Sequence, residues 1–117
     1  MGGALAIAAI SAFPDLIHAS APFYGVPDLN TFSLANIKGP IRGHFGETDA
    51  YKGFSAPEDG KRLEDEGAKH GKDVKVKIWP GAGHAFMNVD RPDAYNADVA
   101  TKALDEVAEF FNTTFSE

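Results

Sequence analysis

Two residues with acid–base side chains follow predicted strands and indicate one kind of chemistry. Asp49 stands in "GETDAY", after a short apolar segment, and His84 stands in "PGAGHAFMN", after a segment of alternating apolar and charged residues. If the two strands lie side by side and parallel, the carboxylate can accept a proton from one imidazole nitrogen and leave the other as a base. The alternative is that Asp49 only forms a turn and that His84 is an ordinary loop histidine.

The elements predicted around these residues alternate between helices and strands. Apolar segments bounded by Pro and Gly predict buried strands, and the strict alternation of Val and Ile with Lys before the histidine loop predicts a half-exposed one. This order is typical of an α/β fold, a three-stranded parallel sheet with helices on its faces, in which chemistry gathers at the carboxyl ends of the strands. The predicted strands cover about residues 16–24, 40–46 and 73–79, and the predicted helices about residues 2–12, 57–70 and 96–112.

The first thirteen residues, "MGGALAIAAISAF", carry no charged side chain. A secretion signal would need a basic start, and the first Lys or Arg of this sequence is Lys38. A membrane span would need about 20 apolar residues, whereas this run ends at Asp15 and already holds Ser11 and Pro14. We therefore expect a helix of small and aliphatic residues that is buried on every side.

Composition limits the class of protein. The 117 residues predict a single domain over 1–117, and 17 acidic against 11 basic residues give a net charge of −6, which argues against nucleic-acid partners and anionic membrane surfaces. The sequence has no Cys for disulfides or thiolate metal sites, and we expect a cytoplasmic protein. His18, His44 and His70 lack the spacing of metal ligands, so we expect no metal.

The start of the chain is typical of the segment just after a nucleophile elbow, a strand–turn–helix motif in which small residues open the helix. An order of nucleophile, then Asp, then His is that of the α/β-hydrolases. On these features the chain resembles the C-terminal half of the dienelactone hydrolase (carboxymethylenebutenolidase-like) family, over essentially its whole length. The matching stretches are "MGGALA", "PFYG", "IKGPIRGHFGETDAY", "VKIWPGAGHAFMN" and "RPDAYN".

The resemblance implies hydrolysis of small-molecule esters or lactones by a Cys-His-Asp triad, with no metal and no cofactor. By the motif match, Asp49 is the acid and His84 the base of that triad. Met1 falls on the residue after the nucleophile, whose backbone N–H helps to form the oxyanion hole.

The sequence departs from the family pattern in two ways. The nucleophile would stand one position before Met1, and none of Ser11, Ser20 and Ser55 sits on an elbow that could replace it. We therefore expect little or no activity from this chain alone. Asn88 stands where bacterial members carry an Arg that holds a substrate carboxylate, so a dienelactone is not implied as the substrate.

Two aromatic residues near these loops each have two interpretations. Tyr24 ends the first predicted strand at the active edge, and Phe86 follows the histidine. Each would either line a substrate pocket or pack against the core. We take both, together with Asn88, as candidate substrate-binding residues.

The predicted strand at 16–24 would normally pair with the strand that carries the nucleophile. Without that neighbour it presents unpaired backbone groups. We therefore expect a weakly stable chain that self-associates or meets a partner chain at the open edge near residues 16–24. Two functions remain open: a hydrolase of the dienelactone hydrolase type whose nucleophile comes from elsewhere, or alternatively a non-catalytic α/β fragment that acts as a binding module.

Overall fold

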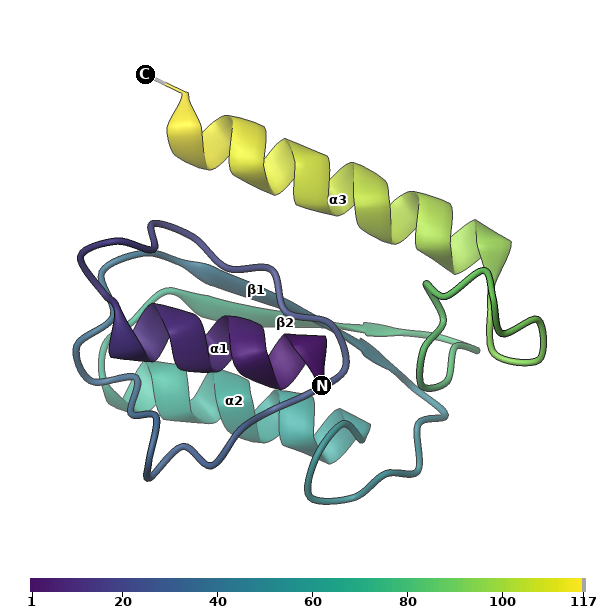
Figure 1. Ribbon diagram of the computed structural model, residues 1–117, viewed down its shortest axis with the longest axis horizontal. Helices are drawn as coiled ribbons and strands as arrows, with labels where there is room; N and C mark the ends of the chain where they lie inside the picture. Colours follow the sequence, from purple (N-terminus) through teal and green to yellow (C-terminus); the bar gives the residue numbers. More distant parts are fainter. Residues whose placement is uncertain (117) are drawn as a thin grey trace.

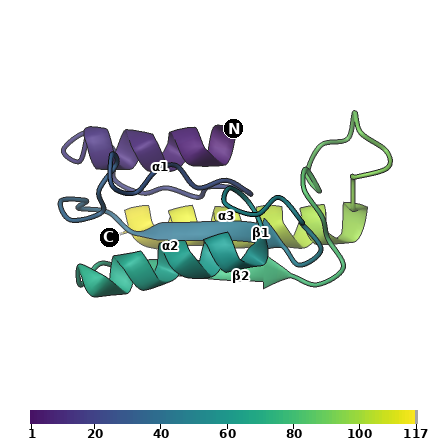
Figure 2. The same cartoon turned by 90° about the horizontal axis from the view of Figure 1, so that it is seen from below.

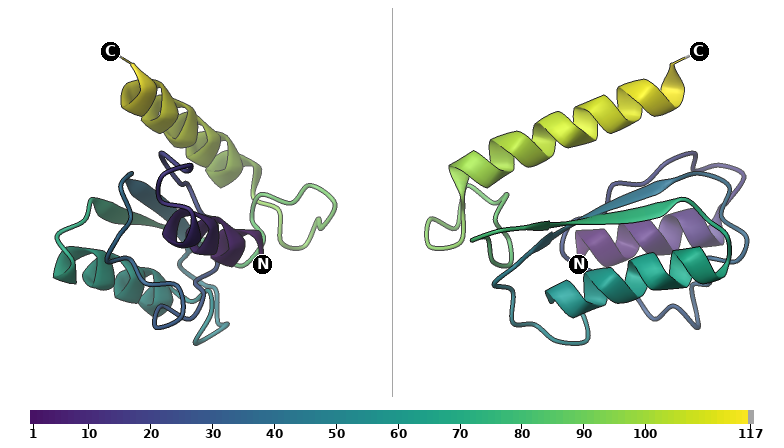
Figure 3. Two further views of the ribbon diagram at one scale, coloured as in Figure 1. Left: turned by 60° about the vertical axis from the view of Figure 1, so that its left-hand side comes forward. Right: turned by 180° about the vertical axis from the view of Figure 1, so that it is seen from behind.

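Three layers build the molecule, which we describe from a computed structural model over residues 1–116. The elements in chain order are α1 (Gly2–Ala12), β1 (Ile41–Gly46), α2 (Pro57–Lys69), β2 (Val74–Trp79) and α3 (Ala97–Phe115). Helices α1 and α2 lie on one face of the small sheet, and α3 lies on the other face (Figures 1 and 3). Turning the molecule brings α1 and α2 in front of the strands and leaves α3 behind them (Figure 2). This arrangement confirms the predicted α/β class.

Strands β1 and β2 form a parallel pair in continuous register. Their first residues, Ile41 and Val74, lie opposite each other, and so do their last residues, Gly46 and Trp79. The chain crosses from one strand to the other through α2, which packs against both. The loops that follow the two strands therefore leave the sheet at the same edge, where ligands bind in parallel α/β sheets.

The segment predicted as a further strand, 16–24, is not a regular strand. Two isolated parallel bridges join it to β1, one at Ser20 and one at Phe23. Between them stands Pro22, whose carbonyl accepts a hydrogen bond from β1 but which has no N–H to complete the ladder. The predicted three strands are thus corrected to two strands and an extended strip, residues 19–24, which we call the bridged strip.

The predicted helices are confirmed, with small shifts at their ends. The first prediction matches α1, the second helix ends at Lys69 rather than 70, and the third extends to Phe115 rather than 112. Asn96 caps α3, because its side chain accepts the N–H of Val99 at 3.2 Å. Among the helices described in residues 1–116, none has both the length and the apolar content to cross a membrane.

One face of α1 forms part of the core, and the opposite face is exposed. Gly3, Ile7 and Ile10 are buried, and the two isoleucines belong to the main core cluster with β1 and the loop before it. Leu5 is 60% exposed, and Leu16, just beyond the helix, is 72% exposed. Within residues 1–116 the helix is therefore buried on one face only, because no element of these residues covers its outer face.

The start of α1 approaches the bridged strip through a glycine, which gives a testable prediction. A Cβ at Gly3 would lie 2.1 Å from the carbonyl oxygen of Phe23, whereas a Cβ at Gly2 would meet nothing within 4 Å. Gly3→Ala should lower the free energy of unfolding by roughly 1–3 kcal/mol, because helix and strip must move apart. Gly2→Ala, the matched control, should leave it unchanged or raise it slightly, since Ala favours helix. Urea titrations measure the difference, and equal stabilities would contradict this packing.

Candidate active site

The loops after β1 and β2 are held against each other at the C-terminal ends of the two strands. A Cβ at Gly46 would lie 2.5 Å from the carbonyl oxygen of Ala82, so only Gly allows the two loops to approach this closely. Thr48 donates two hydrogen bonds to the same carbonyl, from its N–H at 2.9 Å and its hydroxyl at 3.0 Å. The Glu47 carboxylate accepts the N–H of Gly81 at 3.1 Å. These contacts fix the relative position of the two loops and of the side chains they carry.

The two loops bring Asp49 and His84 into direct contact. His84 Nδ1 lies 2.9 Å from Asp49 Oδ2. The other oxygen, Asp49 Oδ1, accepts the N–H of Tyr51 at 3.0 Å, and Asp49 is only 5% exposed. A carboxylate held at both oxygens orients the imidazole and favours the tautomer that carries its proton on Nδ1. The second nitrogen, Nε2, has no hydrogen-bond partner within residues 1–116, and the side chain is 34% exposed.

The backbone is strained at two positions around the imidazole. Ala85, directly after His84, has a φ of 64°, and Tyr24 has a φ of 37°. Such left-handed values cost non-glycine residues about 1–3 kcal/mol and gather at functional sites. The ring centroids of Tyr24 and His84 are 5.0 Å apart. Burial raises the pKa of the Tyr24 phenol, with a smaller opposing effect from a hydrogen bond with the backbone of Met87, so the phenol stays neutral beside the imidazole.

Of the two interpretations of Phe86, substrate pocket or core, the structure places the side chain in the core. It is fully buried in a cluster with Trp79 and Val99, because α3 packs over the histidine loop at this point. Its ring lies 5.1 Å from that of Tyr24, between centroids, so it supports Tyr24 from the interior. Of the two aromatic candidates, only Tyr24 therefore lies beside the imidazole with part of its surface exposed.

The remaining candidates, Asn88 and Met1, lie at the surface. The Asn88 side chain accepts the N–H of Asp90 at 3.0 Å and so belongs to a turn. Met1 is 80% exposed at the start of α1, and a groove of about 370 Å³ next to it is lined by Gly2 and Tyr24 among others. Substrate binding by Asn88 and oxyanion stabilisation by Met1 stay predictions.

Sequence reasoning missed Tyr51, which contributes to the pair in two ways. Its N–H holds the Asp49 carboxylate, and its ring lies 6.3 Å from that of His84 while remaining 66% exposed. The first contact has a signal in the sequence, because an Asp in a polar turn often bonds the N–H two residues later. The contact between the rings of Tyr51 and His84 depends on how the two loops meet, and no local sequence pattern indicates it.

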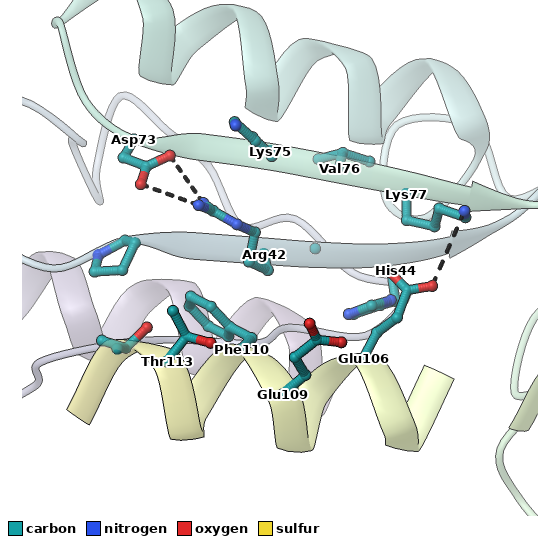
Figure 4. A pocket seen from close by; sticks show the side chains of 13 residues that line it. Arg42, His44, Asp73, Lys75, Val76, Lys77, Glu106, Glu109, Phe110 and Thr113 are labelled. Carbon is teal, nitrogen blue, oxygen red and sulfur yellow. Dashed lines mark hydrogen bonds and ion pairs between the residues drawn. The ribbon is translucent and has the colours of Figure 1, made fainter. Parts of the chain in front are cut away.

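A separate groove of about 560 Å³ lies between the sheet and α3, away from the acid–base pair (Figure 4). Its charged side chains largely neutralise one another. Arg42 donates to both oxygens of Asp73 at 2.9 and 3.0 Å, and Lys77 lies 3.9 Å from Glu106. In the part of the chain that the structure describes, no group of three or more His, Cys, Asp or Glu could hold a metal ion. The candidate active site is therefore the Asp49–His84 pair.

The fold and this site define a class of protein. An Asp–His pair on the loops that leave the carboxyl edge of a parallel sheet is the arrangement of α/β-hydrolases. A comparison with known families narrows the class. The model of the dienelactone hydrolase family matches residues 1–115, and the chain belongs to that family.

Three similar proteins illustrate the match. A protein of Aquifex aeolicus, provisionally named a carboxymethylenebutenolidase, is 37% identical over 112 residues, which are 96% of this chain and 47% of that protein. "Protein usf" of Aquifex pyrophilus is 38% identical over 94% of this chain and 46% of its own length. The crystal structure of a dienelactone hydrolase-like promiscuous phosphotriesterase from metagenomic libraries is 18% identical with a TM-score of 0.80, over 97% of this chain and 49% of that one. The chain thus spans about half the length of the curated relatives it matches.

Proposed function

We propose that this chain supplies the acid and the base of a nucleophile–histidine–aspartate triad in a hydrolase of small esters or lactones. The 2.9 Å contact between His84 Nδ1 and Asp49 Oδ2 carries the proposal. The carboxylate is buried, whereas the imidazole is one-third exposed, so the base can be reached by a reacting group. Membership of the dienelactone hydrolase family supports the reaction class.

This geometry supports the following roles for the two residues. His84 Nε2 accepts the proton of the attacking thiol or hydroxyl as that atom bonds to the carbonyl carbon of the ester. The same nitrogen then gives the proton to the leaving oxygen as the C–O bond breaks. Asp49 stabilises the imidazolium between these steps, and the N–H of Met1 is the proposed donor to the developing oxyanion. Water, deprotonated by His84, then bonds to the acyl carbon, and the imidazolium returns the proton to the nucleophile as its bond to the acyl group breaks.

The experiment joins the part of the Aquifex aeolicus relative that precedes its matched region to Met1 of this chain. The joined protein should hydrolyse p-nitrophenyl acetate, and the 117-residue chain alone should give no rate above buffer. Replacing the nucleophilic Cys or Ser before Met1 with Ala should abolish the activity, because His84 then has no group to activate. A folded joined protein that hydrolyses no short-chain ester or lactone would count against the proposal.

A second candidate, a non-catalytic binding module, is favoured by the exposed apolar face of α1, where Leu5 is 60% exposed. If the chain is such a module, it should bind a partner tightly, and the joined protein should not hydrolyse esters. The ester assay separates the two functions, because only the hydrolase needs His84.

We further propose a cytoplasmic location, which the absence of Cys supports.

A further inference from the structure

A polar groove of about 570 Å³ lies between the loops that carry the acid–base pair and the start of α3. Three segments line it: Thr48 after β1, the glycine-rich loop with His84 after β2, and residues 93–97. This volume is within the range of small-molecule sites. The reaction steps proposed for His84 and Asp49 assign no part of a substrate to this polar groove.

The outer wall of the polar groove is anchored to the histidine loop. Residues 91–95 form a turn in which the carbonyl of the first residue accepts the N–H groups of the fourth and fifth, at 2.9 and 2.8 Å. The next N–H, that of Asn96, donates to the carbonyl of Phe86 at 3.0 Å, two residues after His84. The side chains of the turn are therefore held at a defined position relative to the imidazole.

The charge of the polar groove is negative. Asp93 is the one carboxylate among the residues of 1–116 that line it. No Lys, Arg or His nitrogen of residues 1–116 lies within 4.0 Å of this carboxylate. Glu47 adds a second negative charge close by, because its carboxylate accepts the N–H of Gly81 in the wall of the groove. An uncompensated charge of this sign attracts a cation and repels an anion.

An aromatic residue adjoins this carboxylate in the sequence and lines the same groove. Tyr95 is half-buried, and neither cation–π contact within residues 1–116 involves its ring. Aromatic rings attract ammonium groups through the negative charge of their faces. A carboxylate and an aromatic ring in one groove are a suitable combination for a substrate with an ammonium group.

The start of α3 does not reverse this preference. A helix N-terminus favours anions through its free N–H groups. Here the Asn96 side chain already accepts the N–H of Val99, and Asp98 places a negative charge in the first turn. Arg91, in the turn before the helix, does not line the groove.

The proposed reaction indicates which part of an ester lies here. His84 gives its proton to the leaving oxygen, so the alcohol part of the ester lies beside the imidazole. We propose that the polar groove holds this alcohol part, and that Asp93 and Tyr95 select alcohol parts that carry an ammonium group. The inference rests on the proposed function and adds a substrate class to it.

The kinetic test uses the joined protein and two esters of the same shape. One is acetylcholine, and the other is the neutral acetate ester with a tert-butyl group in place of the trimethylammonium group. After correction for the rates of the two esters with hydroxide, kcat/KM should be at least about twofold higher for acetylcholine. This preference should decrease as salt is added, because the charges are exposed.

Variants of the polar groove should change the ratio of the two kcat/KM values. Asp93→Asn should lower it about two- to fivefold, and Asp93→Lys at least about fivefold. Tyr95→Leu should lower it about two- to fivefold. Asp105→Lys is the matched control, because Asp105 is exposed on α3 and does not line the groove, so the ratio should stay within about 1.5-fold of that of the unchanged protein. Circular dichroism verifies that each variant is folded.

A binding measurement tests the polar groove without hydrolysis. In a nuclear magnetic resonance titration of the joined protein, choline should shift the amide resonances of residues 93–97. The neutral alcohol with a tert-butyl group should shift them less at the same concentration. Asp93→Lys should weaken choline binding at least about fivefold.

Two results would overturn the ammonium subsite. The first is an equal effect of Asp93→Lys and Asp105→Lys on the ratio of the esters. The second is faster hydrolysis of acetoxyacetate, whose alcohol part carries a carboxylate, than of acetylcholine by the unchanged joined protein.

The outcomes also separate this subsite from the proposed function. Choline binding that depends on Asp93, without hydrolysis of any ester, would refute the function and retain the ammonium site. Hydrolysis that requires His84, with an ester ratio that Asp93→Lys does not change, would refute the subsite and retain the function.

Discussion

Replacing His84 with Ala should lower kcat/KM for p-nitrophenyl acetate about 10³- to 10⁴-fold in the protein joined to the Aquifex aeolicus segment. In the proposed function, His84 takes the proton from the nucleophile and returns it to the leaving oxygen, and the variant lacks this group. Since the side chain is one-third exposed and outside both core clusters, the fold should persist. Initial rates near neutral pH, with circular dichroism to verify folding, measure the effect.

Asp49→Asn should cause a loss close to that of His84→Ala, because the amide neither stabilises the imidazolium nor fixes the productive tautomer. Combining the two substitutions should lower the rate little beyond either one, since the residues act as a unit. His18→Ala is the control, because His18 is exposed and lies outside the site, so the rate should stay unchanged. Losses that multiply in the double variant would show that the two residues act independently and that the 2.9 Å contact is not catalytic.

The contact between Asp49 and His84 could be predicted from the sequence, because each residue directly follows a segment with the pattern of a strand. The alternating segment before His84 and the apolar segment before Asp49 indicated two strands, and a helix between them indicated that the strands are parallel. Parallel neighbours put both loops at one edge, which is the geometry observed. The positions of Asp49 and His84 follow from local sequence patterns and from the rule that parallel strands end on the same side of a sheet. Their prediction therefore needed no knowledge of how the side chains pack.

The features that the sequence left open, or predicted differently from the structure, all depend on which surfaces the fold covers. Phe86 stands in the loop that carries His84, and its burial follows from α3 packing over that loop. Pro22 interrupts the ladder between the strip and β1, so an apolar segment with strand composition forms only bridges. The composition of α1 predicts burial on all sides, yet composition cannot say whether an outer layer is present to bury it.

Acid should destabilise this chain through His44, a residue outside the proposed site. His44 is 3% exposed, its Nδ1 accepts the indole N–H of Trp79 at 3.1 Å, and its ring stacks on Phe23 at 4.8 Å between centroids. Burial, and secondarily the positive charge of Lys77, lowers the pKa of His44 from 6.5 to about 4. The folded chain therefore holds this imidazole neutral at a pH where the unfolded chain binds a proton.

The direction of the pH effect follows from this difference. Above pH 6.5 the imidazole is neutral in both states, and the contribution of His44 to stability is complete. As the pH falls from 6.5 towards 4, protonation stabilises only the unfolded chain, so the free energy of unfolding decreases. A pKa difference of this size corresponds to a loss of roughly 3 kcal/mol by pH 4.

Urea titrations between neutral pH and pH 4 test this effect by comparison with a variant that has no titratable group at position 44. His44→Asn keeps an acceptor for the Trp79 N–H, and carboxylates that titrate in this range do so in both proteins. The unchanged chain should lose roughly 3 kcal/mol more than the variant over the range, and the control His18→Asn should behave as the unchanged chain does. Parallel profiles for the unchanged chain and His44→Asn would mean that the folded chain accommodates an imidazolium.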